Sequence, residues 1–307
     1  MTVEIQLPTG VTFLERGWLS SNNVLLHDSE QAVLVDTGYW THAQQTEDLI
    51  QSVIGTQTLN TIINTHLHSD HCGGNAHLQA LFPKLETLIP PGHASYVDSW
   101  DSNALTYTPT GQHCPQFKKS GVLRDGDHFC VAGNTWRIHA APGHDPHSIV
   151  LFNEEDRMLV SADALWENGF GVVFPEIEGL SAFNEVESTL QIIERLAPKL
   201  VLPGHGAAFT DVTGALVRAR SRLAQFQNAP DKHASYAAKV LLKFKLLELQ
   251  KVKLSDYCVW AHSAQYLHLL HAMYSTDISF ETWIFDLCQS LETSGACTIN
   301  DEYIINH

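Results

Sequence analysis

The chain has 307 residues, 44% of them hydrophobic and 17% charged, which is the composition of a globular protein long enough to bury a large core. Its net charge of −16 comes from residues 1–214, which carry 25 acidic and 9 basic side chains and disfavour, without excluding, nucleic acid as a partner. The longest apolar runs are too short to span a bilayer, which argues against a membrane protein.

The first hundred residues alternate between expected strands and helices. Short apolar runs on either side of a polar turn indicate a hairpin, and apolar residues at helical spacing indicate helices. In chain order, the expected elements are a hairpin over 23–35, a helix over 41–54, a strand over 59–64 and a helix over 74–82.

Residues 96–120 interrupt this alternation. They contain Pro109, Gly111 and Pro115 and few periodic apolar positions, which predicts a long loop or a short helical insertion. Such a segment either covers a substrate site or is a plain surface excursion, and the sequence leaves both open. Beyond it we expect strands at 136–140, 149–152, 158–160 and 199–202, and an amphipathic helix over 183–196.

After residue 209 the pattern becomes helical. Helices are expected at 214–227, 233–250, 255–274 and 280–292, followed by two short β runs within 294–305. Helices that precede a terminal hairpin indicate a small winged-helix-like domain. Nucleic-acid recognition is one role for it, but the hairpin carries Asp301 and Glu302 and no Lys or Arg, which favours packing or dimerisation.

The densest group of metal-capable side chains is His66-X-His68-X-Asp70-His71, directly after the strand expected at 59–64. Three imidazoles and a carboxylate in six residues suit a divalent metal such as zinc. A solvated histidine-rich loop is the alternative interpretation.

Three further ligand-type residues, His144, Asp163 and His205, follow the ends of expected strands. His144 and His205 each come directly after a glycine, which lets the backbone turn sharply and approach a site closely. Because all three recur at strand ends, the sequence predicts that they share one rim with the first cluster and form a single metal centre.

The series His66, His68, Asp70, His71, His144, Asp163 and His205 resembles the metallo-β-lactamase-fold hydrolase superfamily over roughly residues 10–210. The resemblance implies the α+β class and a four-layer αβ/βα sandwich with metals on one edge. Residues 1–213 would be this catalytic domain, and residues 214–307 a small, mainly helical, winged-helix-like C-terminal domain. The resemblance also implies two metal sites: His66, His68 and His144 would bind the first ion, Asp70, His71 and His205 the second, and Asp163 would bridge both.

Within the superfamily, Asp163 in place of Cys, together with Asp70-His71, is similar to glyoxalase II and the ribonucleases rather than to the antibiotic-degrading lactamases. His68 differs from the flavodiiron oxygen reductases, which usually have Glu there. Glyoxalase II-like members commonly carry a second His four residues after the position of His144, whereas His147 is three residues after it. The helical tail also lacks their Lys/Arg run, and it resembles that of lactamase-like endoribonucleases.

For each of three further residues, the sequence leaves two possible roles open. Asp36 either orients a metal-binding histidine by a hydrogen bond or caps the helix expected from residue 41. Cys72 is either a small buried residue or part of the active-site lining. His147 either faces the substrate or caps its loop.

Together these features predict a binuclear metal-dependent hydrolase in which Asp70 orients the attacking hydroxide and accepts its proton. The expected substrate is a small thioester, ester or lactone, because an acidic surface repels anions. A phosphodiesterase or endoribonuclease of the same fold is one alternative, and a regulatory or interaction protein with a structural metal site is another.

The expected cofactors are two divalent ions, zinc by default, with iron or manganese also suited to these ligands. A small molecule is the expected partner, and the tail also suits a homodimer. The six cysteines form no Cys-X-X-Cys pair, and the opening residues MTVEIQLPTG lack the pattern of a secretory signal. We therefore expect reduced thiols and a cytoplasmic location.

Overall fold

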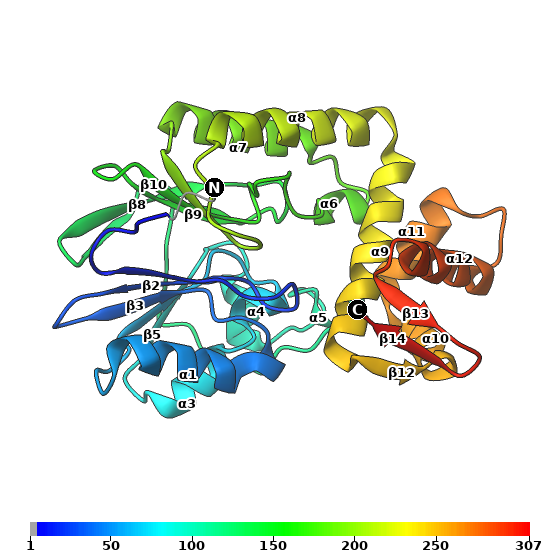
Figure 1. Cartoon of the computed structure of the whole chain (residues 1–307), viewed down its shortest axis with the longest axis horizontal. Coiled ribbons are helices and arrows are strands. Elements are labelled where there is room, and N and C mark those ends of the chain that lie inside the picture. The colour runs from blue at the N-terminus through cyan, green and yellow to red at the C-terminus, as the bar shows by residue number, and fades with distance from the viewer. Residues whose placement is uncertain (1–4) are drawn as a thin grey trace.

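The computed structural model describes residues 5–307 and contains two β-sheets packed face to face, with helices on both outer faces (Figure 1). The six-stranded sheet runs in the order β1 (Val11–Leu14), β2 (Asn23–His27), β3 (Ala32–Val35), β4 (Thr61–Ile63), β5 (Glu86–Ile89), β6 (Gly121–Val122). The five-stranded sheet runs in the order β11 (Leu200–Pro203), β10 (Met158–Ala162), β9 (Ile149–Asn153), β8 (Asn134–Ala140), β7 (His128–Val131). The predicted α+β sandwich is confirmed.

The first sheet contains the expected hairpin over 23–35. Strands β2 and β3 pair antiparallel, and β3, β4 and β5 then pair in parallel. Helices α1 (Ala43–Ile54) and α3 (Asn75–Leu81) cover its outer face and bury Ile50 and Leu78 against Leu34 and Ile62. Each such aliphatic side chain contributes about 1.5–3 kcal/mol when it is fully buried, so this apolar face fixes the position of both helices.

The second sheet carries the amphipathic helix predicted over 183–196, which is confirmed as α7 (Phe183–Leu196). Its buried positions include Val186, Leu190 and Ile193, at the spacing of one helical face. Between the two sheets, Val35 of β3 shares a buried cluster with Trp136 of β8. This core holds the sheets in a fixed relation to each other.

The turns that carry the predicted metal ligands come together at one edge of the sandwich. Backbone hydrogen bonds connect the two sheets there: Ile149 N donates to Thr65 O at 2.9 Å, and Asn22 N donates to Gly204 O at 2.7 Å. The turn after β4 therefore lies against the turn that precedes β9. The turn after β11 lies against the segment that leads into β2.

Residues 96–120 form an insertion that shares a buried cluster with the first sheet. It contains α5 (Tyr107–Thr110), and α4 (Ala94–Ser99) leads into it. Tyr107 and Phe117 are buried with Ile89 of β5. Of the two predicted possibilities, a long loop or a short helical insertion, the helical insertion is confirmed.

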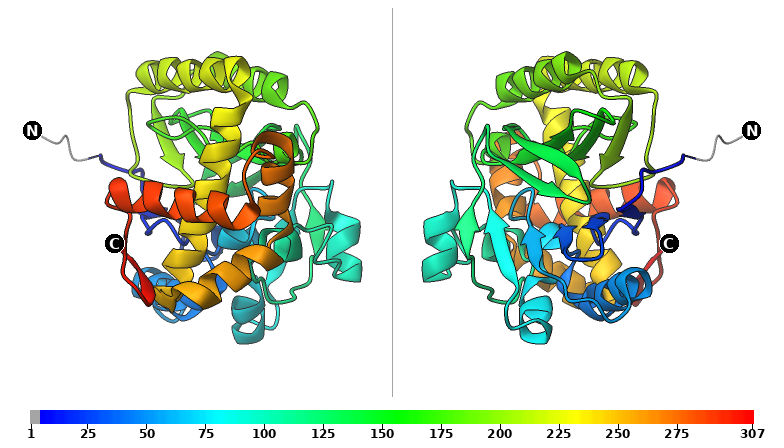
Figure 2. Two further views of the ribbon diagram at one scale, coloured as in Figure 1. Left: turned by 90° about the vertical axis from the view of Figure 1, so that its right-hand side faces the viewer. Right: turned by 90° about the vertical axis from the view of Figure 1, so that its left-hand side faces the viewer.

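The C-terminal part begins with a helix that lies beside α7 over the second sheet, and its other elements flank one side of the sandwich (Figure 2). It consists of α8 (Val212–Asn228), α9 (Pro230–Leu249), α10 (Leu254–Ser263), α11 (Gln265–Tyr274) and α12 (Phe280–Thr293), with a sheet in the order β12 (Lys251–Lys253), β14 (Tyr303–Asn306), β13 (Cys297–Ile299). The expected terminal hairpin is confirmed. Strand β12 pairs with β14 and was not predicted, because three residues of alternating Lys and Val carry little strand signal.

The single helix predicted over 255–274 is wrong. The helix is interrupted at Ala264, whose backbone is extended at φ −80° and ψ 101°. Ala264 is buried, and the break allows Tyr257 of α10 and Leu267 of α11 to pack into the same cluster. A straight helix would point one of these faces away from that core.

Helix α8 packs on α7: Ala215 and Leu223 share a buried cluster with Leu190. The division between residues 213 and 214 stays a prediction, and this packing favours grouping α8 with the sandwich. None of the helices within 5–307 is both long and apolar enough to cross a membrane.

Candidate metal centre

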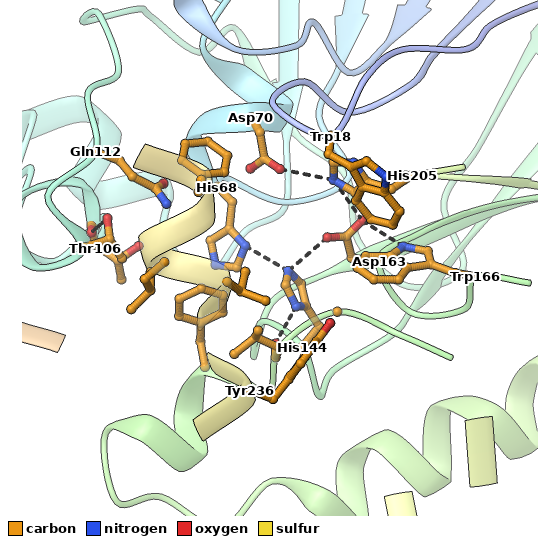
Figure 3. Close-up of a pocket in the computed structure, with 17 residues that line it drawn as sticks. Trp18, His68, Asp70, Thr106, Gln112, His144, Asp163, Trp166, His205 and Tyr236 are labelled. Carbon is orange, nitrogen blue, oxygen red and sulfur yellow. Dashed lines mark hydrogen bonds and ion pairs between the residues drawn. The ribbon is translucent and has the colours of Figure 1, made fainter. Parts of the chain in front are cut away.

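All seven predicted ligands lie together at the sandwich edge. Five of them, His68, Asp70, His144, Asp163 and His205, line a cavity of about 110 Å³ (Figure 3). The potential ligand atoms of the seven residues form three groups within which all atoms lie within 4.8 Å of one another. The groups are His66, His68 and His144; Asp70, His71 and His205; and His66, His71 and Asp163. The first two have the same membership as the two sites that the family resemblance implied.

In the first group, His144 Nε2 lies 2.8 Å from His68 Nδ1. The other ring nitrogen of His144, Nδ1, is 2.5 Å from the carbonyl oxygen of Val172, to which it donates. Gly171 allows this close approach, because a Cβ atom at that position would lie 2.4 Å from His144 Nδ1. The carbonyl therefore fixes the tautomer that turns Nε2 of His144 toward the cluster.

In the second group, His205 Nε2 lies 3.1 Å from Asp70 Oδ2, and His71 Nε2 lies 3.9 Å from the same oxygen. Helix α2 (Ser69–Cys72) begins directly after His68 and carries Asp70 and His71. One short turn therefore delivers two predicted ligands to this group, while His68 belongs to the first group.

Asp163 lies between the two groups. Its Oδ2 is 3.4 Å from His144 Nε2, and its Oδ1 is 3.4 Å from His71 Nε2 and 3.8 Å from His205 Nε2. Gly204 is required beside it, since a Cβ atom there would lie 2.3 Å from Asp163 Oδ1. The carboxylate thus reaches histidines of both groups, as a bridging ligand would.

The residues fit divalent metal ions. Nε2 of His66 and Nε2 of His71 are buried and have no hydrogen-bond partner within residues 5–307. Such orphaned nitrogens are costly unless something binds them. Within residues 5–307, the cavity is lined by two carboxylates, Asp70 and Asp163, and by no Lys or Arg. A bound cation would therefore compensate the negative charge of these carboxylates.

Charge in the cluster leads to the same conclusion. Burial, together with the nearby His71 and His68, holds the pKa of His66 well below its usual value, so this ring stays in the neutral form that binds metals. Burial alone would lower the pKa of His71, but Asp36, Asp163 and Asp70 raise it well above its usual value. Positive charge is therefore favoured beside Nε2 of His71, where a metal ion would supply it.

Asp36 lies behind His71 and outside the cavity. Its Oδ2 is 2.7 Å from His71 Nδ1 and accepts a hydrogen bond from Thr65 Oγ1, while its Oδ1 accepts one from Thr65 N. The role of orienting a histidine is confirmed. The alternative of a helix cap is wrong, because residue His42 precedes α1 and no side chain caps that helix.

The other two open residues do not line the cavity. Cys72 is fully buried, with its sulfur 3.2 Å from Tyr107 Oη and 3.8 Å from Cys114 Sγ, which confirms the small buried role. His147 packs edge-on against His93, and its backbone N–H donates to Asp145 Oδ1.

Several residues of the site were missed by the sequence analysis. Trp166 Nε1 donates to Asp163 Oδ1 at 3.2 Å, and Trp18 stacks on the ring of His205. Trp166 stands three residues after Asp163, a proximity that could have marked it. Trp18 had no such signal. The cavity is also lined by Thr106, Thr110 and Gln112 of the insertion and by Tyr236, Val240, Leu241 and Phe244 of α9.

Comparison with known proteins agrees with this geometry. Over 261 residues the chain is 22% identical to an atrochrysone carboxyl ACP thioesterase of Aspergillus fumigatus, covering 84% of this chain and 70% of that protein. The chain spans 51% of the length of two further atrochrysone carboxyl ACP thioesterases that it matches, from Aspergillus terreus and Aspergillus novofumigatus. The human acyl-coenzyme A thioesterase MBLAC2 is 23% identical over 224 residues, covering 66% of this chain and 80% of that protein.

The fold has solved counterparts. A metallo-beta-lactamase family protein from Thermus thermophilus superimposes with a TM-score of 0.57 at 19% identity, covering 98% of this chain and all of that one. Residues 16–205 match the family described as the metallo-beta-lactamase superfamily, and they hold all seven predicted ligands. The chain therefore belongs to the metallo-beta-lactamase superfamily.

Proposed function

We propose that this protein is a metal-dependent thioesterase. The observation that carries the proposal is the buried cluster of imidazoles and carboxylates at one end of a cavity whose other walls are largely apolar. Such a site suits hydrolysis of a carbonyl compound that bears an apolar group. The descriptions of the fungal and human relatives as thioesterases support a thioester over an ester or a lactone.

We assign the ligands as the clustering of their atoms suggests. His66, His68 and His144 would hold one divalent ion, Asp70, His71 and His205 a second, and Asp163 both. Zinc is the proposed metal, and iron or manganese would accept the same donors. We also propose a cytoplasmic location, which six free cysteines support.

When bound, two divalent ions would lower the pKa of a shared water and stabilise the oxyanion that develops at the carbonyl. Asp70 is the candidate catalytic residue: its carboxylate lines the cavity, and Oδ2 can accept the proton of the attacking water. His205 Nε2 lies 3.1 Å from Asp70 Oδ2, close enough for both atoms to bind the same ion. Trp166 holds the carboxylate of Asp163 in place through its indole N–H.

The rest of the cavity suits a neutral acyl group. Phe174, Val240, Leu241 and Phe244 supply apolar wall, and within residues 5–307 no Lys or Arg lines the cavity. A phosphodiester or RNA backbone would call for such cations. We therefore place the endoribonuclease alternative second and the purely structural metal site third.

The test uses protein stripped by a chelator and then restored with zinc. We expect hydrolysis of acyl-pantetheine thioesters that appears only after metal is restored, with two ions per chain by elemental analysis. Lactones and short RNA serve as competing substrates. Cleavage of RNA that falls at high salt, without thioester hydrolysis, would contradict the proposal. Full metal binding without turnover of any substrate would contradict it as well.

A further inference from the structure

An apolar groove of about 450 Å³ adjoins the metal cavity along α9. Tyr236, Val240, Phe244 and Leu247 of α9 form one wall, and Leu291 of α12 contributes to the lining. Tyr236, Val240 and Phe244 also line the metal cavity, so the two spaces share a wall. The groove is therefore a side space of the site rather than a separate surface feature.

Trp18 stands at the junction of the two spaces. It lines both of them, and its side chain is 57% exposed. Its ring stacks on His205 with centroids 5.2 Å apart and planes 5° apart, and it meets the edge of Trp166 (Figure 3). A substrate group that extends from the metal centre into the groove would pass along the face of this indole.

The groove also has polar lining residues, which are Lys239, Lys243, Ser294 and His307. The ammonium of Lys243 donates to Ala296 O at 2.7 Å and to His307 O at 2.9 Å, so it points at the C-terminal strands. Its aliphatic stem then lines the groove. Lys239 is partly exposed and lies one residue before Val240 on the same helix.

We propose that this groove binds the acyl group of the substrate and sets the preference for acyl length. The inference rests on the proposed thioesterase function, because a thioester has an apolar acyl end and a polar, amide-bearing thiol arm. The apolar groove matches the acyl end. Thr106, Thr110 and Gln112 on the cavity wall offer hydrogen-bonding groups for the arm. Each methylene buried in the groove would strengthen binding by about fourfold.

The test measures binding of thioethers, which cannot be hydrolysed, to the zinc-loaded full chain by calorimetry. S-dodecyl-pantetheine is expected to bind at least about tenfold more tightly than S-ethyl-pantetheine. Leu247→Arg puts a charge into the groove, and Val240→Trp fills its junction with the cavity. Either change should weaken dodecyl binding by at least about tenfold. Leu249→Arg is the matched control, because Leu249 is 37% exposed on the same helix and outside the groove lining.

Equal dodecyl affinity in wild type and in a folded Leu247→Arg or Val240→Trp protein would overturn the inference, and thermal unfolding identifies the folded variants. Equal affinity of wild type for both thioethers would overturn it too. Thioester hydrolysis with no dependence on these two positions would reject the groove and leave the thioesterase in place. Groove-dependent thioether binding without any thioester hydrolysis would instead reject the proposed activity.

Discussion

His71 lies between two carboxylates that contact opposite nitrogens of its ring. Asp36 Oδ2 is 2.7 Å from Nδ1, and Asp163 Oδ1 is 3.4 Å from Nε2. Asp36 is itself held by both donors of Thr65. The ring can therefore present only Nε2 to a metal, and its orientation is set before any ion arrives. At the scale of single residues, the groups behind the predicted ligands organise the site together with the predicted ligands themselves.

We expect Asp36→Ala to weaken metal binding without removing a ligand. Loss of a carboxylate that orients a metal-binding histidine typically costs about 10–100-fold in affinity or activity. Competition with a chelator would measure the affinity. Asp48→Ala is a matched control, because Asp48 is an exposed carboxylate on α1. Unchanged affinity in Asp36→Ala would contradict this positioning role.

Asp163→Ala should remove the contact between the two ligand groups. Metal content and thioesterase activity should fall together, activity by at least ~100-fold, because both proposed ions lose a ligand. Elemental analysis of the purified variant and an assay on one acyl thioester check this. Full metal occupancy in Asp163→Ala would show that the bridge is assigned wrongly.

Helix α9 is the element that serves both the fold and the cavity. Tyr236, Val240, Leu241 and Phe244 line the cavity, while His233 is buried near its start between Phe183 and Phe226. The Val173 N–H donates to His233 Nε2 at 3.1 Å. The neutral imidazole thereby connects α9 to the segment that follows Asp163.

This burial predicts a loss of stability in acid. Burial lowers the pKa of His233 from 6.5 to about 4, so below pH 6.5 the unfolded chain binds a proton that the folded chain does not. The stability present above pH 6.5 is therefore lost as the pH falls, by about 2 kcal/mol between pH 7.5 and 5. Urea unfolding of metal-free wild type and His233→Gln should show this difference.

The metal ligands are the same in both proteins, so their own pH dependence cancels in the comparison. His128→Gln is the control, because His128 is exposed. The His128→Gln variant should keep the wild-type pH dependence of the free energy of unfolding. A His233→Gln protein that loses stability in acid as steeply as wild type would contradict the assignment to His233.

At the scale of the whole molecule, the C-terminal helices hold the insertion against the cavity. Trp260 Nε1 of α10 donates to Gly111 O at 3.1 Å, directly after α5. A Cβ atom at Gly111 would lie 2.6 Å from the same indole nitrogen, so the two parts meet in close contact. The adjacent Thr110 and Gln112 line the cavity. The C-terminal part therefore shapes the site from two sides, through α9 and through this insertion.

Trp260→Ala should loosen the insertion without disturbing the metal ions. We expect KM for acyl thioesters to rise by about tenfold, the effect of about 1.4 kcal/mol, with metal content unchanged. Steady-state kinetics and elemental analysis measure the two quantities. Val259→Ala, at a neighbouring residue that is 70% exposed, is the control. An unchanged KM would show that the insertion keeps its position without Trp260.

Local pattern was enough for much of this architecture. The apolar periodicity of 183–196 predicted α7, whose buried residues lie on one helical face. Two continuous apolar runs on either side of a polar turn predicted the pair β2–β3, whose residues are buried at nearly every position. The pattern failed over 255–274, where both halves are helical by themselves. Only the shared core of α10 and α11 requires the break at Ala264.

By itself the sequence determined which side chains could hold metal, because four of the seven stand within six residues and the others follow glycines or strand ends. Only the tertiary structure decided what surrounds them. Trp18, Asp36 and the wall of α9 are far from the motif in the chain, and their roles arise from contacts between separate sheets and helices. Local sequence identifies the metal-capable side chains, whereas their assembly into one centre and the shape offered to a substrate depend on long-range packing.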